Sequence, residues 1–292
     1  MIHLLSGSTM GAELPTPTRK GINPLFRARI TVDGESRQCF IKPQPDKLAV
    51  DTSSPINREV INEVVGYLLA RACGFRVPDH AGVILLERHQ IPAAVLNHVD
   101  SISPTPQHDA FVCWFSEDTG HKDLVALHSA SVANGELEER LHARIAQDLV
   151  SRKELPALIS FDEWTLNSDR NAGNVLGSAS TYITPIDHGR IFCSPIWKHN
   201  ELKAMCRWVI ENQMIHWANR GKPGWSQDKR NMSARLVAYQ KFVEAFTQTG
   251  HSTVRDTLTD LSVDGDEIES ILDCLYARLD EDHARFAIGL VA

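Results

Sequence analysis

The feature that most constrains the fold is a change of pattern along the chain, from strand signals to helical periodicity. Residues 26–32 alternate apolar and polar side chains, Asp33-Gly34 follows as a two-residue turn signal, and residues 37–42 can return as the partner strand. Later segments repeat apolar residues at helical spacing. Strands first and helices later favour an α+β protein over alternating βαβ units. We expect two lobes, a β-rich N-lobe over residues 1–115 and a mostly helical C-lobe over residues 116–292.

Local signals place further elements within these lobes. Ser54 can cap a helix that starts at Pro55 and stops at Gly74. Residues 83–86 and 111–115 read as strands, and residues 101–108 as a loop and a candidate connection between the lobes. Pro156 starts a helix in the second half, and residues 267–286 predict one amphipathic helix.

Composition excludes several classes of function. The net charge of −7 over 292 residues argues against a protein that binds nucleic acid directly through a broad basic face. The N-terminal residues resemble neither a signal peptide nor a membrane anchor. The six cysteines contain no C-x-x-C pair, which is typical of reduced thiols in a cytoplasmic protein. The histidines show no H-E-x-x-H spacing, so the linear sequence predicts no zinc site.

Three polar residues carry the chemical signal. Asp169 lies five positions before Asn174, and Asp187 follows in the segment Pro185-Ile186-Asp187-His188-Gly189. Between Asn174 and Asp187, a turn cluster is flanked by short apolar runs, which predicts a hairpin. Because a hairpin brings its two ends together, we expect Asn174 and Asp187 to lie side by side, with Asp169 in the loop before them.

Phosphoryl transfer requires this set of side chains. It uses a carboxylate to accept a proton from the attacking hydroxyl, and oxygen donors to hold magnesium on the phosphates. Asp169 is the candidate base, and Asn174 and Asp187 are the candidate Mg²⁺ ligands. The same chemistry needs a cation for the ATP phosphates, which Lys42 can supply with an acidic partner on the following helix. Glu63 and Glu59 both remain candidates for that partner.

These motifs resemble those of the HipA-like kinases. The matching residues are Asn167-Ser168-Asp169-Arg170, Asn174 and Ile186-Asp187-His188-Gly189, together with Phe40-Ile41-Lys42, Ile61-Asn62-Glu63 and Val77-Pro78. The phosphoinositide 3/4-kinases have a more distant version of the second-half pattern. The resemblance implies a protein-kinase-like fold with ATP and Mg²⁺ bound between the lobes, Asp169 as base, Asn174 and Asp187 as metal ligands, and Lys42 paired with Glu63. It further implies a protein serine or threonine as acceptor, and an antitoxin-like partner, because the best-known members are toxins of toxin–antitoxin modules.

The sequence departs from the kinase pattern at the phosphate-covering loop. No G-x-G-x-x-G is present, and the only candidate is the segment that contains Gly7, Ser8 and Gly11. The chain also begins almost at the kinase core, without the extra N-terminal subdomain of the longest HipA-type toxins, which bears on a toxin role and not on the chemistry. Two alternatives stay open: a kinase for a small molecule or lipid, and a catalytically inactive kinase fold that binds nucleotide or a partner.

Overall fold

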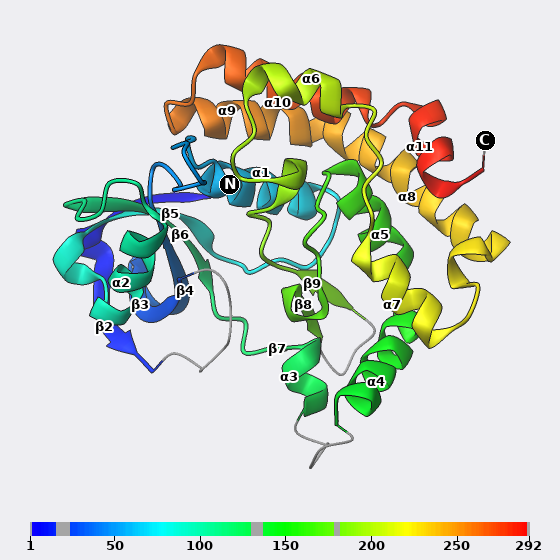
Figure 1. Cartoon of the computed structure of the whole chain (residues 1–292), viewed down its shortest axis with the longest axis horizontal. Coiled ribbons are helices and arrows are strands. Elements are labelled where there is room, and N and C mark those ends of the chain that lie inside the picture. The colour runs from blue at the N-terminus through cyan, green and yellow to red at the C-terminus, as the bar shows by residue number, and fades with distance from the viewer. Residues whose placement is uncertain (1, 16–23, 130–136, 178–181, 291–292) are drawn as a thin grey trace. The chain divides into compact units, whose positions relative to one another are not determined.

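The computed structural model describes residues 2–15, 24–129, 137–177 and 182–290 (Figure 1). The chain divides into two compact units, one comprising Met1–Val64 and Pro78–Gly120, the other Val65–Val77 and His121–Ala292. The first unit holds the larger sheet, and the second holds most of the helices. The protein is therefore a two-lobed α+β protein, as the order of sequence patterns predicts.

The first unit is built on a six-stranded sheet with strand order β1-β5-β6-β4-β3-β2. Its strands are β1 (His3–Ser6), β2 (Met10–Leu14), β3 (Phe26–Val32), β4 (Glu35–Gln44), β5 (Ala81–Glu87) and β6 (Ala110–Glu117). The predicted hairpin is confirmed, because β3 and β4 pair antiparallel across Asp33-Gly34. The apolar residues of β3 face inward and join one buried cluster with the inward residues of β4, β5 and β6.

Helix α2 (Ala93–Ile102) packs Val95 and Leu96 against that cluster. The loop after α2 leads into β6, and both of these elements belong to the first unit. The expectation that residues 101–108 connect the lobes is therefore wrong. The chain passes from the first unit to the second after Val64, returns after Val77, and passes to the second unit again after Gly120.

The sheet must curl, because its two edge strands are joined by a short link. Strands β1 and β2 lie at opposite edges, yet only the 3₁₀ turn Gly7–Thr9 connects them. Six flat strands would separate these edges by about 24 Å. A link from Ser6 to Met10 reaches at most about 14 Å. The edges therefore approach each other at the end of the sheet where this turn lies.

Helix α1 (Glu59–Ala72) begins later than Ser54 and Pro55 predict. The residues before it form a small folded-back loop, with bridges between Lys47 and Ile56 and between Val50 and Ser53. Asn57 accepts a hydrogen bond from the Glu59 backbone N–H at 3.0 Å through its side chain and so caps the helix. The predicted stop is correct, since Gly74 has a φ of +81° just beyond the last turn.

The second unit is mainly helical. Its helices are α3 (Leu124–Ser129), α4 (Leu137–Ser151), α5 (Leu155–Trp164), α6 (His199–Met205), α7 (Gln213–Gly221), α8 (Lys229–Ala245), α9 (His251–Asp260), α10 (Gly265–Ala277) and α11 (Glu281–Ile288). A three-stranded sheet, β7 (Lys122–Asp123), β8 (Val175–Gly177) and β9 (Ile183–Pro185), accompanies them. Helix α5 starts at Leu155, one residue before the predicted Pro156, and is buried along nearly its whole length.

The last predicted helix is wrong in one respect, because its segment forms two helices. The segment expected as a single helix over residues 267–286 breaks after Ala277, and α11 starts at Glu281. Asp280 ends the continuity, because its carboxylate accepts hydrogen bonds from the backbone N–H groups of Asp282 and His283 at 3.0 and 3.3 Å. An aspartate that caps a new helix competes with continuation of the old one. Among the described residues, no helix combines the length and apolar content needed to cross a membrane.

Candidate active site

The loop that carries Asp169 is shaped by the end of helix α5. The Asn167 backbone N–H donates to the Asp162 carbonyl at 2.7 Å, and Leu166 has a φ of +57°, so the chain reverses sharply. The Asn167 side chain then accepts from the Asp169 N–H at 3.2 Å. This turn leaves Asp169 exposed on a backbone that is fixed on both sides.

The hairpin β8–β9 brings the next two predicted residues together. Val175 pairs with Pro185, and the Ile186 N–H donates to the Asn174 carbonyl at 3.1 Å. Asn174 and Asp187 therefore flank the open end of the hairpin, as the sequence predicts; its turn, residues 178–181, lies outside the described residues. Asp187 has a φ of +61°, an uncommon backbone conformation for a residue with a side chain. Such conformations gather at functional sites, where surrounding contacts maintain them.

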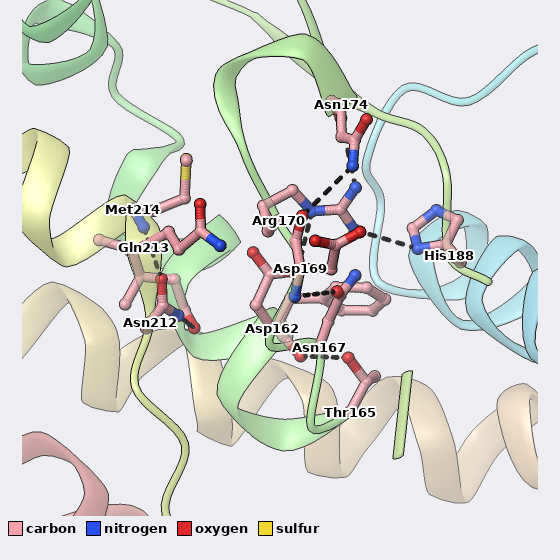
Figure 2. A network of polar contacts seen from close by, with 12 residues as sticks. Asp162, Thr165, Asn167, Asp169, Arg170, Asn174, His188, Asn212, Gln213 and Met214 are labelled. Carbon is pink, nitrogen blue, oxygen red and sulfur yellow. Dashed lines mark hydrogen bonds and ion pairs between the residues drawn. The ribbon is translucent and has the colours of Figure 1, made fainter. Parts of the chain in front are cut away.

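Asn174 also contacts the loop of Asp169. Its amide nitrogen donates to the Asp169 carbonyl at 3.3 Å, so its amide oxygen is the atom that can face a cation (Figure 2). Asn174 and Asp187 are both partly exposed. An amide oxygen and a carboxylate are hard donors of the kind that Mg²⁺ prefers. This donor set fits a magnesium ion that also binds phosphate oxygens.

Arg170 joins the two loops. Its guanidinium is buried and donates to the Asn174 carbonyl at 3.2 Å and to the Ile186 carbonyl (Figure 2). It also donates to His188 Nδ1 at 3.1 Å. Because arginine has no acceptor atom, His188 must offer an unprotonated Nδ1 at this contact. The Arg170 guanidinium thus holds the backbone carbonyl of Asn174 and that of Ile186, the residue before Asp187.

Asp162 anchors this arginine from helix α5. Its Oδ1 accepts from Arg170 Nε at 3.0 Å, and neither side chain is more than 1% exposed. Burial raises the pKa of Asp162 to about 7, and the Arg170 charge opposes that rise. A buried ion pair costs desolvation free energy, so its retention is explained better by the position it fixes than by stability.

The motif spacing does not single out Asp162 as the partner of Arg170. The signal in the sequence is an aspartate directly after the mostly apolar helix start Leu155-Pro156-Ala157-Leu158-Ile159-Ser160-Phe161. A charged residue on a helix that is buried all round needs a partner. His188 is likewise buried and hydrogen-bonded to Arg170.

In the first unit, Lys42 pairs with Glu63. Lys42 lies on β4 and Glu63 on α1, with Nζ and Oε1 2.5 Å apart. The side chains are 15% and 2% exposed. Glu59, the rival candidate, is also buried, and the ion pair of Lys42 is with Glu63. The buried Glu63 carboxylate fixes the position of the Lys42 ammonium on a central strand of the sheet.

The segment with Gly7, Ser8 and Gly11 has a different environment. It forms the turn between β1 and β2, where Gln90 Nε2 donates to the Gly7 carbonyl at 2.9 Å. The Ser8 hydroxyl lies 2.7 Å from the Ser6 hydroxyl. A Cβ at Gly7 would overlap the amide end of the Gln90 side chain, which would have to move.

Comparison with known proteins supports the fold. No protein-family model matches the chain, and no curated protein matches it. Among solved structures, the chain is similar to the Helicobacter pylori proinflammatory kinase CtkA, with a TM-score of 0.57 and 15% identity over 99% of each chain. The Golgi casein kinase matches with a TM-score of 0.37 and 14% identity over 93% of this chain and 70% of that one, which is too low to add to the assignment. The likeness to CtkA shows that this chain has a two-lobed, kinase-like α+β fold.

Proposed function

We propose that the protein is an ATP- and Mg²⁺-dependent phosphotransferase that acts on a hydroxyl of a protein serine or threonine. The observation that carries the proposal is the convergence of Asp169, Asn174 and Asp187 on two loops that share the Arg170 guanidinium. The proposal extends the resemblance to the HipA-like kinases, including an antitoxin-like partner. The fold is similar to that of the kinase CtkA, which is compatible with this activity.

Each residue has a role in the proposed reaction. The acceptor oxygen bonds to the γ-phosphorus while the bond from that phosphorus to the β–γ bridging oxygen breaks, and ADP leaves. Asp169, which is exposed, takes the proton of the acceptor hydroxyl. Asn174 and Asp187 would hold Mg²⁺ through oxygen atoms, and Lys42, fixed by Glu63, would bind phosphate oxygens. Mg²⁺, when bound, offsets the negative charge on the phosphates.

The test is transfer of labelled γ-phosphate from ATP by the wild type and by Asp169→Ala. We expect the variant to lose about 10²- to 10⁴-fold of the rate, the usual contribution of a positioned base. Asp273→Ala removes an exposed carboxylate of α10 and is the matched control, with an unchanged rate expected. Equal transfer by wild type and Asp169→Ala would refute the assignment of the base.

A panel of acceptors decides the substrate class. Host proteins, small hydroxyl compounds and phosphoinositide vesicles are offered with the same labelled ATP. Protein labelling that depends on Asp169 supports the proposal, whereas labelling of lipid or small molecules alone replaces it with the alternative kinase class. ATP binding in a thermal-shift titration, with no transfer to any acceptor or to water, would identify a nucleotide-binding module without turnover.

A further inference from the structure

Two histidines and an aspartate come together in the first unit. His3 lies on β1, Asp33 in the β3–β4 turn, and His80 just before β5. One ligand atom from each of these three side chains can lie within 4.8 Å of the other two. His3 Nε2 is hydrogen-bonded to His80 Nδ1 at 3.2 Å, a contact that a shared ion would replace. The other ring nitrogen of His3, Nδ1, is 3.9 Å from an Asp33 carboxylate oxygen. We propose that His3, Asp33 and His80 bind one divalent transition-metal ion of the Zn²⁺ type.

The spacing of the two imidazoles fits a shared ion. Two nitrogens that each lie about 2.0–2.1 Å from a tetrahedral Zn²⁺ are about 3.4 Å apart. The observed 3.2 Å between His3 Nε2 and His80 Nδ1 is close to that value. With Asp33 as the third ligand, one coordination position of a tetrahedral ion is left for water. A water ligand suits this site, because the three side chains are only partly buried. Imidazole donors select a transition metal over Mg²⁺, which prefers oxygen.

The backbone already holds the three residues in place. His3 pairs with Gly82 in the β1–β5 ladder, two positions from His80. The His80 carbonyl accepts from the Glu117 N–H at 2.7 Å. Asp33 occupies a tight turn with a φ of +50°. Little ordering entropy is therefore lost when an ion binds.

The curl of the sheet explains why no linear motif predicts this site. β1 and the β3–β4 hairpin lie in different halves of the sheet order, and they meet only because the sheet closes toward itself. An ion held by all three residues would tie the β1–β5 edge to the β3–β4 turn. Its binding would stabilise the first unit, because only the folded sheet assembles the ligands.

The test uses the full-length protein without a histidine tag, reduced, stripped with EDTA and kept in excess Mg²⁺. Competition with a chromophoric chelator measures Zn²⁺ affinity for wild type, His3→Ala, Asp33→Asn and His80→Ala. We expect one strong site in the wild type and a loss of affinity of more than about tenfold in each histidine variant. His89→Ala is the control, because His89 is an exposed histidine that pairs with the Glu87 carboxylate at 3.2 Å. We expect it to bind Zn²⁺ as the wild type does.

Thermal unfolding and Co²⁺ spectra complete the design. Zn²⁺ should raise the melting temperature of the wild type and of His89→Ala, and leave His80→Ala unchanged. Bound Co²⁺ should show visible bands without strong thiolate charge transfer, which separates this site from the cysteines. Equal Zn²⁺ affinity in wild type, His3→Ala and His80→Ala would overturn the proposal, as would a thiolate spectrum. Asp33→Asn, on an exposed turn, keeps the test valid should a histidine variant fail to fold.

Discussion

The Arg170 guanidinium contacts three segments that are separate in sequence. It touches Asp162 on α5, the Asn174 carbonyl before β8, and the Ile186 carbonyl and His188 after β9. A planar fork with five donors can satisfy partners in several directions at fixed angles. Lysine has the same charge but cannot reproduce that geometry. Arg170 therefore sets the relative position of the loops that carry Asn174 and Asp187.

Replacement of Arg170 by lysine should lower phosphotransfer by about 10²-fold, because a displacement near 1 Å at the reacting groups costs that much. The Mg²⁺ concentration for half-maximal rate should rise as well, since both predicted ligands lose a shared anchor. Steady-state kinetics over a Mg²⁺ series measures both effects. Arg255→Lys alters an exposed pair with Glu269 and should change neither. A variant with unchanged Mg²⁺ dependence would show that Arg170 does not position the metal ligands.

Gly66 provides space for His188. A Cβ at this position of α1 would overlap the His188 Cβ and lie 2.5 Å from its Cγ. Alanine in place of glycine normally stabilises a helix by about 1 kcal/mol. Here overpacking costs about 1–3 kcal/mol, so Gly66→Ala should lower the unfolding free energy and disturb the contact of His188 with Arg170.

Urea unfolding of Gly66→Ala beside Gly265→Ala measures the sign of this effect. Gly265 begins α10, and a Cβ there meets nothing within 4 Å. Gly265→Ala should therefore be neutral or stabilising. If both substitutions stabilise the protein, residues 187–189 must move readily to accommodate the added methyl group.

At the scale of elements, helix α5 serves both the core and the candidate site. Its last turn carries Asp162, which anchors Arg170, and Glu163, whose two oxygens accept from Arg235 Nη2 of α8 at 2.6 and 2.8 Å. Arg278 donates to the Trp164 carbonyl at 2.8 Å and to the Glu163 carbonyl at 2.5 Å, and so caps this helix end. The end of α5 determines where the loop of Asp169 starts, so this buried network supports the site indirectly.

Glu163→Gln should destabilise the second unit by roughly 3–5 kcal/mol, because it leaves the buried Arg235 charge without a counter-charge. Chemical denaturation followed by tryptophan fluorescence reports mainly this unit, which contains five of the six tryptophans. Glu269→Gln removes the carboxylate of an exposed pair with Arg255, and solvent screening makes the expected change small. A similar effect of both substitutions would mean that burial adds nothing to the Glu163 pair.

At the scale of the whole molecule, local sequence patterns predict individual elements well but do not predict contacts between distant segments. The β3–β4 hairpin, the start of α5 and the β8–β9 hairpin follow from turn chemistry and periodicity, and the two-lobed fold follows from their order. The start of α1 was mispredicted because residues 46–57 bond to one another instead of joining the helix. The anchoring of Arg170 by Asp162 and the meeting of His3 with His80 depend on how distant segments pack, which neither spacing nor propensity encodes.

Two groups, the buried Asp162 and the half-buried His283, should give the stability of the whole protein opposite dependences on pH. Burial lowers the pKa of His283 to about 4, with help from the Arg278 charge. The unfolded chain then binds a proton that the native state does not bind between about pH 6.5 and 4, so this group weakens the native state as pH falls. Asp162 has its pKa raised to about 7, chiefly by burial. The native state binds the extra proton between about pH 7 and 4, so this group strengthens the native state as pH falls.

Unfolding free energies of His283→Gln and Asp162→Asn, each compared with wild type from pH 7.5 to 4.5, should separate the two effects. His283→Gln should become more stable relative to wild type on acidification, and Asp162→Asn less stable. Each slope is bounded by about 1.4 kcal/mol per pH unit, the limit for one proton. His283 is partly reached by solvent, so its slope should be well below that limit. Parallel curves for wild type and either variant would mean that the corresponding side chain titrates alike in the folded and unfolded protein.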